Sequence, residues 1–315
     1  MIITNSFIKI PKKSSLITFY VNQFFQKVIT KYQSIKNQKV NSKGNEASRN
    51  LSQVQMQANH QFVDIFNFRR LKSIASSGLS NKFMIEDKNS GNVYVAKCYR
   101  SNEHCAESDD SNLEQKMPNE YRILSNLNHP TIIKVYGLSH LDFVGDPMPT
   151  VIFEYVPNDS LENILNGTVP TFWNHTKLLI NLYGIAVGMS YLHSNNVLHG
   201  DLKPSNVLLD SNCYPRIIDF GISMSSKPGQ SIIKLESFRG TIWYISPEIF
   251  EALRYSKKSD VYAFAITVFR LFGNSLLNLT TYQLIHKIVH CGRHEFTAPT
   301  PNCYKDLITR CWAQD

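Results

Sequence analysis

The fold of this chain is decided by one stretch of sequence, HGDLKPSN at residues 199–206. Three further short stretches stand in a fixed order around it, namely VAK at 95–97, DFG at 219–221 and SPE at 246–248. Each of these motifs is weak evidence alone, because short patterns arise by chance, whereas an ordered set is specific. The set and its neighbourhood cover the chain from about residue 68 onward, so one interpretation has to explain nearly everything outside the N-terminal tail.

Composition and charge divide the 315 residues into a basic tail and a neutral body. Hydrophobic residues make up 43% of the chain and charged residues 18%, which excludes a collagen-like or wholly disordered protein. Residues 1–60 hold nine of the 33 lysines and arginines and one of the 25 acidic residues, so residues 61–315 are neutral. The net charge of +8 therefore belongs to the tail, and no nucleic-acid partner is expected.

Cysteine spacing and hydropathy bear on the compartment. The six cysteines are scattered, without a C-x-x-C pair, which is typical of reduced thiols rather than of a disulfide framework. No run of about 18 apolar residues predicts a membrane span, and residues 1–11 make a poor secretory signal. These features predict a cytoplasmic protein.

Residues 1–66 are interpreted as a basic, largely disordered arm with one amphipathic helix. Apolar residues recur at helical spacing from Ile17 to Ile35, with lysines elsewhere around the helix. Such a helix could make weak contact with an anionic membrane or a partner. The alternatives are a helix packed on the domain's own surface and a marginal helix in a disordered arm.

Residues 67–315 change from a strand-rich to a helix-rich pattern. Strands are expected at residues 83–86, 93–98, 132–136 and 151–155, the first two joined as a hairpin. Helices are expected after Pro118, at 176–194 and at 259–272. The pattern predicts an α+β fold with a small β-rich N-lobe over about 67–156, a larger helical C-lobe over about 157–315, and a site between them.

Together, the motifs resemble those of the eukaryotic protein kinase family over about residues 68–315. The resemblance implies a two-lobed kinase fold, ATP with Mg²⁺ (or Mn²⁺), and phosphoryl transfer to protein substrates. Lys203 after the catalytic aspartate, with Thr241 before SPE, resembles the serine/threonine type. Residues 307–315 resemble a helix typical of the tyrosine-kinase-like and tyrosine kinase branches, so the implied activity is that of a tyrosine-kinase-like Ser/Thr kinase.

The resemblance assigns catalytic roles to Asp201, Lys203, Lys97 and Glu120. Asp201 would accept the proton of the substrate hydroxyl, and Lys203 would neutralise charge on the moving phosphoryl group. Lys97 would hold the α- and β-phosphates of ATP, and Glu120 would pair with Lys97 to fix its position. The alternative for all of these residues is a set of surface charges on an inert, kinase-shaped scaffold.

The resemblance also places the metal and adenine contacts. Asn206 and Asp219 would offer Mg²⁺ the hard oxygen ligands that it prefers. The backbones of Glu154 and Val156 would bond to the adenine edge, and Phe153 falls at the gatekeeper position. Ordinary core packing is the alternative for the apolar members. The full set of implied ATP contacts is Ile74, Ala75, Ser77, Lys82, Val95, Lys97, Phe153, Glu154, Val156 and Leu208.

The glycine-rich loop of the family is altered in this chain. Counting back fifteen residues from the lysine of VAK places Lys82 where the family has a valine that covers adenine. The loop glycines then fall on Ala75, Ser77 and Ser80, with Gly78 one place off. Because glycine lets the backbone approach phosphate closely, a poorer lid is predicted. The alternative function is therefore a pseudokinase or nucleotide-binding signalling scaffold with weak or no transfer activity.

Two further departures concern Gly200 and the C-terminus. Many kinases have an arginine before the catalytic aspartate, where it binds an activation-loop phosphate, and Gly200 cannot do so. In the family, the helix at 307–315 leads into another element and a last helix. The sequence therefore predicts a C-terminally incomplete kinase domain, in which Glu248 lacks its arginine partner.

Overall fold

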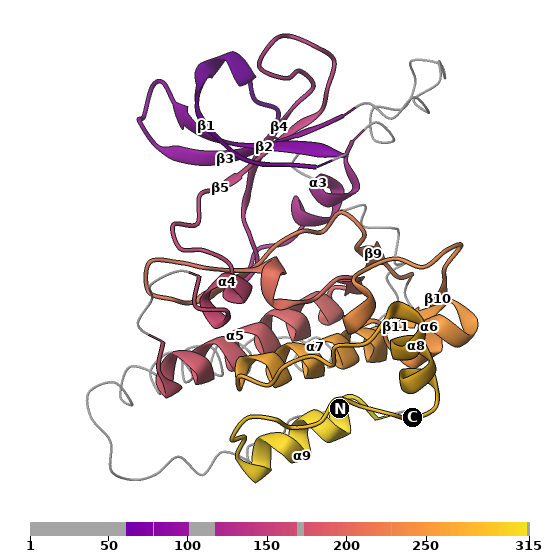
Figure 1. Cartoon of the computed structure of the whole chain (residues 1–315). Coiled ribbons are helices and arrows are strands. Elements are labelled where there is room, and N and C mark those ends of the chain that lie inside the picture. Colours follow the sequence, from indigo (N-terminus) through magenta and orange to yellow (C-terminus); the bar gives the residue numbers. More distant parts are fainter. Residues whose placement is uncertain (1–60, 78, 101–116, 169–172, 228, 314–315) are drawn as a thin grey trace, which may run out of the picture. The chain divides into compact units, whose positions relative to one another are not determined.

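The computed structural model describes residues 61–77, 79–100, 117–168, 173–227 and 229–313 (Figure 1). They belong to a unit that spans residues 58–315. The predicted N-terminal helix and the acidic residues 101–114 lie outside the described part of the chain. No described helix is both long enough and apolar enough to cross a membrane.

The N-lobe is built on a five-stranded antiparallel sheet in the order β1-β2-β3-β5-β4 (Figure 1). The expected hairpin is β2–β3, and its turn is closed by Asp87, which accepts hydrogen bonds from the backbone N–H groups of Asn89 and Ser90. The strands are β1 (Phe68–Ser76), β2 (Ser80–Asp87), β3 (Val93–Tyr99), β4 (Val135–Ser139) and β5 (Thr150–Glu154).

The sheet has two chemically different faces, because successive side chains of a strand point to opposite sides. On the outer face, Ile85, Ala96 and Ile152 form a small apolar cluster with Ile65 and Phe68. The inner face carries the alternate residues of β2, β3 and β5. These are Lys82, Met84, Val95, Lys97, Val151 and Phe153.

Strand β4 begins later than the sequence predicts. The apolar run from residue 132 had indicated a strand at 132–136, but β4 spans Val135–Ser139. Ile132 instead forms an isolated bridge with Ile217 of the C-lobe, and the Ile133 N–H donates to the Ile217 carbonyl at 3.0 Å. Ile132 and Ile133 are both buried. The apolar run therefore reflects contact with Ile217 of the C-lobe, and not a place in the N-lobe sheet.

The N-lobe also begins earlier than the expected boundary at residue 67. The backbones of Gln61 and Val63 exchange hydrogen bonds with Leu138 at 3.0 Å, so residues 61–63 cover the edge of β4. A short 3₁₀-helix, η1 (Ile65–Asn67), then buries Ile65 in the outer cluster. The sequence carries little periodicity here, because the contacts are made by the backbone and a single isoleucine.

The C-lobe is mainly helical, and its two central helices lie within two residues of their predicted bounds. Helix α7 is apolar almost all round because it is buried, with Ile266, Val268 and Phe269 fully inaccessible. The helices are α4 (Leu161–Leu165), α5 (His175–Ser194), α6 (Pro247–Ala252), α7 (Lys257–Leu271), α8 (Thr281–Val289) and α9 (Asn302–Cys311).

Short antiparallel strand pairs and two 3₁₀-helices complete the C-lobe. The pairs are β6 (Val197–Leu198) with β9 (Met224–Ser225), β7 (Val207–Leu209) with β8 (Pro215–Ile217), and β10 (Ile232–Lys234) with β11 (Arg254–Ser256). The 3₁₀-helices are η2 (Pro204–Asn206) and η3 (Ile242–Tyr244). The motif at 199–206 thus lies between β6 and β7.

The last helix, α9, packs on α7 through Ile308 and the following Trp312, whose ring lies 5.5 Å from that of Phe269. The sequence predicted a helix over 307–315, and α9 starts earlier, at Asn302. Glu248 is half-buried, and its Oε1 accepts a hydrogen bond of 2.6 Å from the Ser259 hydroxyl. Within the described part of the chain, Glu248 makes no ion pair.

Candidate active site

A buried ion pair joins Lys97 on β3 to Glu120 on helix α3 (Asn119–Leu124). The Lys97 Nζ lies 2.6 Å from Glu120 Oε2 and 3.2 Å from Asp219 Oδ1. Burial alone would lower the pKa of Lys97, but the carboxylates of Glu120 and Asp219 outweigh it and hold that pKa above its ordinary value. Lys97 is therefore a fixed cation at neutral pH.

Glu120 is a hub that ties α3 to the DFG segment. Its Oε1 accepts a hydrogen bond from the Phe220 backbone N–H at 3.1 Å, and its Oε2 also accepts one from the Tyr99 hydroxyl. Burial, followed by the nearby carboxylate, raises the pKa of Tyr99 well above its ordinary value, so the hydroxyl remains a donor. The Asn119 amide donates to the carbonyls of Phe220 and Ser223 at 3.3 and 2.9 Å. Tyr99 and Asn119 carry no motif that would have predicted these roles.

Asp219 is held in an unusual backbone conformation with its carboxylate toward two lysines. Its φ is 68°, in the left-handed region that residues other than glycine seldom adopt. Burial would raise the pKa of Asp219, but the charges of Lys97 and Lys82 hold it below its ordinary value. The side chain of Phe220 is fully buried, 4.9 Å from the ring of His199. Asp219 therefore offers an ionised carboxylate on a fixed support.

Hydrogen-bond donors surround Asp201 in the loop at residues 199–206, which the kinase resemblance makes the catalytic loop. Its Oδ2 lies 2.7 Å from Lys203 Nζ and accepts a hydrogen bond from Asn206 Nδ2 at 2.9 Å. Its Oδ1 accepts one from the Thr241 backbone N–H at 2.8 Å, and Lys203 also donates to the Thr241 hydroxyl. Since Asn206 Nδ2 is committed to Asp201, its Oδ1 is the atom left to serve as a metal ligand.

A residue that the sequence did not single out, Asp260 of α7, holds this loop in place. Its fully buried carboxylate accepts hydrogen bonds from the backbone N–H groups of His199 and Gly200 at 2.9 and 3.1 Å. It also bonds to the Tyr255 hydroxyl at 2.6 Å and to His193 Nε2 at 2.8 Å. Burial would raise the pKa of Asp260, but His193, followed by Tyr255, holds it below its ordinary value. The available signal was a lone acid inside an otherwise apolar helix.

Close backbone contacts require glycine at two positions of the site. Gly200 has a φ of 87°, and a Cβ there would lie 3.1 Å from the carbonyl oxygen of Ile222. Gly240 has a φ of 97°, and a Cβ there would lie 2.9 Å from the carbonyl oxygen of Gly200. An arginine at position 200 would be strained by this φ and by the close Ile222 carbonyl, and glycine in its place has no side chain to bind a phosphate.

Two of the residues assigned to adenine, Val95 and Phe153, lie side by side on the inner face of the sheet. Val95 lies opposite Phe153 on β5 and opposite Met84 on β2. Phe153 and Val156 are buried, whereas Ile74 on β1 is exposed. Leu208 lies half-buried on β7 of the C-lobe. In the N-lobe, the backbone N–H of Glu154 donates to the Lys134 carbonyl at 3.0 Å.

The loop between β1 and β2 is a tight turn closed by two serines. The Ser77 N–H donates to the Ser80 carbonyl at 2.9 Å, and the Ser80 N–H donates to the Ser77 hydroxyl at 3.1 Å. Ala75 still belongs to β1, where it lies opposite Lys82. The N–H groups of both serines are thus already used within the turn.

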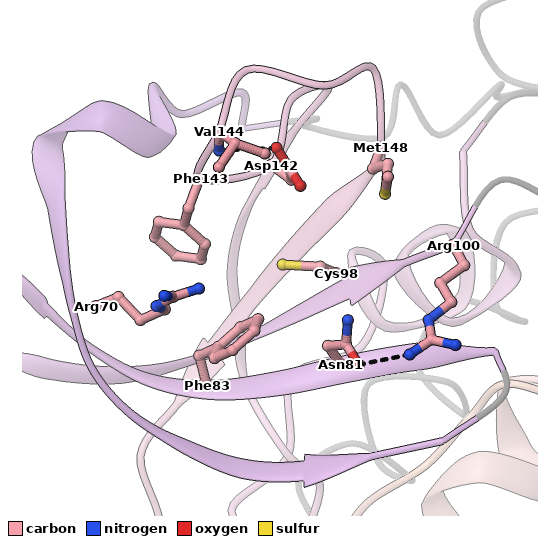
Figure 2. Close-up of a pocket in the computed structure, with 9 residues that line it drawn as sticks. All are labelled: Arg70, Asn81, Phe83, Cys98, Arg100, Asp142, Phe143, Val144 and Met148. Carbon is pink, nitrogen blue, oxygen red and sulfur yellow. Dashed lines mark hydrogen bonds between the residues drawn. The ribbon is translucent and has the colours of Figure 1, made fainter.

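A cavity of about 440 Å³ opens on the outer face of the sheet, between β1–β3 and the segment that joins β4 to β5 (Figure 2). The Arg70 guanidinium lies over the Phe83 ring, 4.9 Å from its centroid, and Arg100 donates to the Asn81 side chain at 3.2 Å. Asn81 and Lys82 are neighbours on β2, and their side chains point to opposite faces of the sheet. The sheet therefore separates this cavity from Lys82, Lys97 and the other residues of the inner face. Its lining residues are Arg70, Asn81, Phe83, Cys98, Arg100, Asp142, Phe143, Val144 and Met148.

Comparison with known proteins gives the same family over the same residues. Residues 68–315 match the protein kinase domain. The chain is 32% identical over 170 residues to a PR5-like receptor kinase of Arabidopsis thaliana, which is 52% of this chain and 25% of that protein. It is 36% identical over 163 residues to the rust resistance kinase Lr10 of Triticum aestivum, covering 49% of this chain and 25% of that protein. The chain thus spans about a quarter of the length of these relatives.

Proposed function

Because this chain belongs to the protein kinase family, we propose that it transfers the γ-phosphate of ATP to serine or threonine hydroxyls of protein substrates. One observation carries the proposal, namely that Lys97, Glu120 and Asp219 meet in a single ion-pair cluster. Phosphoryl transfer depends mainly on positioning and on neutralising negative charge. A cluster that keeps one lysine charged and one carboxylate ionised at neutral pH supplies both.

Asp201 is the residue proposed to orient the attacking hydroxyl and accept its proton. The hydrogen bonds from Asn206 and Thr241 fix the direction of its carboxylate. Lys203 lies between Asp201 and Thr241, where its ammonium can neutralise charge that develops on the transferred group. The Lys203–Thr241 contact supports the serine/threonine type, because these two residues carry that resemblance in the sequence.

Asp219 and Asn206 are the residues proposed to hold Mg²⁺. Both offer hard oxygen atoms, and Asp219 is ionised because its pKa lies below the ordinary value. When bound, the ion would neutralise charge on the phosphates of ATP, and Mn²⁺ could use the same ligands. The left-handed backbone of Asp219 and the bond from Asn206 to Asp201 fix these ligands before any ion arrives.

The test is transfer of labelled γ-phosphate from ATP to a generic acceptor protein, with Mg²⁺ or Mn²⁺, followed by identification of the phosphorylated amino acid. We expect phosphoserine or phosphothreonine, and loss of the signal in Asp201→Asn. The matched control is Asp306→Asn, the same change at an exposed carboxylate on α9. Nucleotide binding without transfer under any condition would instead indicate a nucleotide-binding scaffold, and phosphotyrosine would overturn the substrate class.

A further inference from the structure

We infer that Lys82 on β2 is a second phosphate-binding lysine, which contacts the triphosphate of ATP beside Lys97. The inference rests on the proposed function, because it specifies how this site holds its nucleotide. It differs from the sequence-based expectation, in which Lys82 stood over the adenine ring in place of a valine.

The register of the sheet puts the two lysines side by side. Lys82 lies directly opposite Lys97 in the β2–β3 pair, and on its other side it lies opposite Ala75 of β1. Directly opposed residues of antiparallel strands share a face, with Cβ atoms about 4.5–5.5 Å apart. Lys82 is half-buried. The side chains of Lys82 and Lys97 therefore both project from the inner face of the sheet.

The same register separates Lys82 from the adenine row. Met84, and not Lys82, lies opposite Val95, which in turn lies opposite Phe153. Lys82 belongs to the next row, which holds Lys97, the residue with the phosphate-holding role. Each strand residue on one face is two positions, or about 6.6 Å, from the next. Lys82 thus lies one such step along β2 from the row of Met84, Val95 and Phe153, level with Lys97.

Charge around Lys82 points to an anionic ligand. Two like charges placed opposite each other destabilise a sheet. Lys97 has Glu120 and Asp219 as partners, whereas Lys82 forms no ion pair of its own within the described part of the chain. A bound triphosphate would supply the negative charge that Lys82 lacks.

The serine turn explains why a lysine is useful here. In glycine-rich loops of kinases, the loop covers the phosphates. In this chain, the N–H groups of Ser77 and Ser80 already donate within the turn, so they are not available to phosphate. A charged side chain from the adjoining strand replaces donors that the turn has used, and it does so with a stronger, charge-assisted hydrogen bond.

The experiment is a calorimetric titration of the full chain with Mg-ATP and, separately, with adenosine. The variants are Lys82→Met, Lys82→Arg and a control, Lys134→Met, which removes the same charge from an exposed position of the N-lobe. We expect Lys82→Met to weaken ATP binding about tenfold or more, the loss expected for a charged hydrogen bond. Adenosine binding should stay within about twofold, Lys82→Arg should recover most of the affinity for ATP, and Lys134→Met should match the wild type.

Three results would overturn the inference. Unchanged or tighter ATP binding in Lys82→Met would show that the side chain does not contact phosphate. An equal loss for adenosine and ATP would show that it supports the base or the fold. Lys82→Arg as weak as Lys82→Met would exclude a role for charge. If the wild type bound no ATP, the proposed function itself would fail, whereas ATP binding without transfer would leave the role of Lys82 testable and the kinase activity refuted.

Discussion

The catalytic loop and the β1–β2 turn are both shaped by hydrogen bonds, but the bonds come from different places. The catalytic loop is held from outside, because the buried carboxylate of Asp260 accepts from the N–H groups of His199 and Gly200. The β1–β2 turn is held mainly from within, because the N–H groups of Ser77 and Ser80 both donate inside the turn. One bond comes from outside it, from the Arg100 backbone N–H to the Leu79 carbonyl at 3.0 Å. The catalytic loop is thus fixed to the core, whereas the turn is closed mainly by its own serines.

This difference separates the shape of a loop from its chemistry. In the catalytic loop, the core supplies the hydrogen bonds that define the backbone, so the side chain of Asp201 is left to act on a substrate. In the turn, the hydrogen bonds that define the backbone use the N–H groups of Ser77 and Ser80, so these two donors cannot bind a ligand. Losing glycines therefore need not disorder a phosphate loop, but it changes which groups can bind phosphate. The predictions below test each side of this comparison.

The largest effect is expected from Asp260→Ala. It leaves the N–H groups of His199 and Gly200, with the Tyr255 hydroxyl, buried without their acceptor. Breaking such a network costs about 3–5 kcal/mol, out of the roughly 5–15 kcal/mol that stabilises a domain. Urea unfolding should show this loss, with Asp306→Ala unchanged as the control. A loss below about 1 kcal/mol would mean that the catalytic loop does not depend on the core in this way.

The second prediction concerns transfer rate at constant stability. Asp201→Asn and Lys97→Met should each lower the rate of phosphoryl transfer at least about a hundredfold, the scale of losing a general base or a preorganised charge. Thermal melts should identify any loss that comes from unfolding, and Asp306→Asn and Lys134→Met are the matched controls. Wild-type autophosphorylation in either variant would refute the assigned role.

The third prediction concerns regulation by phosphate. Gly200 offers no side chain to an activation-loop phosphate, and its φ of 87° disfavours any replacement that would. Phosphatase treatment should therefore lower activity toward an outside substrate by less than about tenfold, or 1.4 kcal/mol of barrier. Ser231 and Ser237 are exposed serines between Asp219 and Glu248, where such a phosphate could be carried. A larger drop would show that another cation binds it, and Arg239→Ala, a change at a nearby exposed arginine, would then be the variant to compare.

The sequence predicts residues that act through their own side chains better than residues that hold the backbone of another segment. Asp201, Asn206 and Asp219 stand in short motifs, because each side chain is itself a reactant or ligand, and the periodicity of α5 and α7 follows directly from burial. Asp260 could not be assigned a role, since it acts on another segment's backbone. The backbone N–H groups that it holds lie about 60 residues away in the chain.

The N-lobe shows a second limit of sequence reasoning. Counting residues placed Lys82 over adenine, and the cross-strand register adds that its neighbour on β3 is Lys97. The apolar run at 132–136 was assigned to a strand, although Ile132 and Ile133 are buried against Ile217 of the C-lobe. In both cases the partner had to come from the structure. For Lys82 it is the facing residue of a hairpin, and for Ile132 it is a strand residue about 85 positions away.

The smallest effect, and the sharpest test of the closed turn, is expected from Ser77→Gly. The change removes the hydroxyl that accepts from the Ser80 N–H, and so it frees that N–H for a phosphate oxygen. One hydrogen bond contributes about 0.5–1.5 kcal/mol, and the added freedom of glycine offsets roughly 0.5–1 kcal/mol of it, so ATP binding should tighten by no more than a few fold. Ser76→Gly is the control, because it removes a serine from the end of β1 without freeing the Ser80 N–H. In a Lys82→Met background, Ser77→Gly should restore part of the lost affinity for ATP, since the two groups would serve the same phosphates. Weaker binding in Ser77→Gly, with Ser76→Gly unchanged, would mean that the serine bonds order the turn for the nucleotide and that a self-closed loop is the binding form.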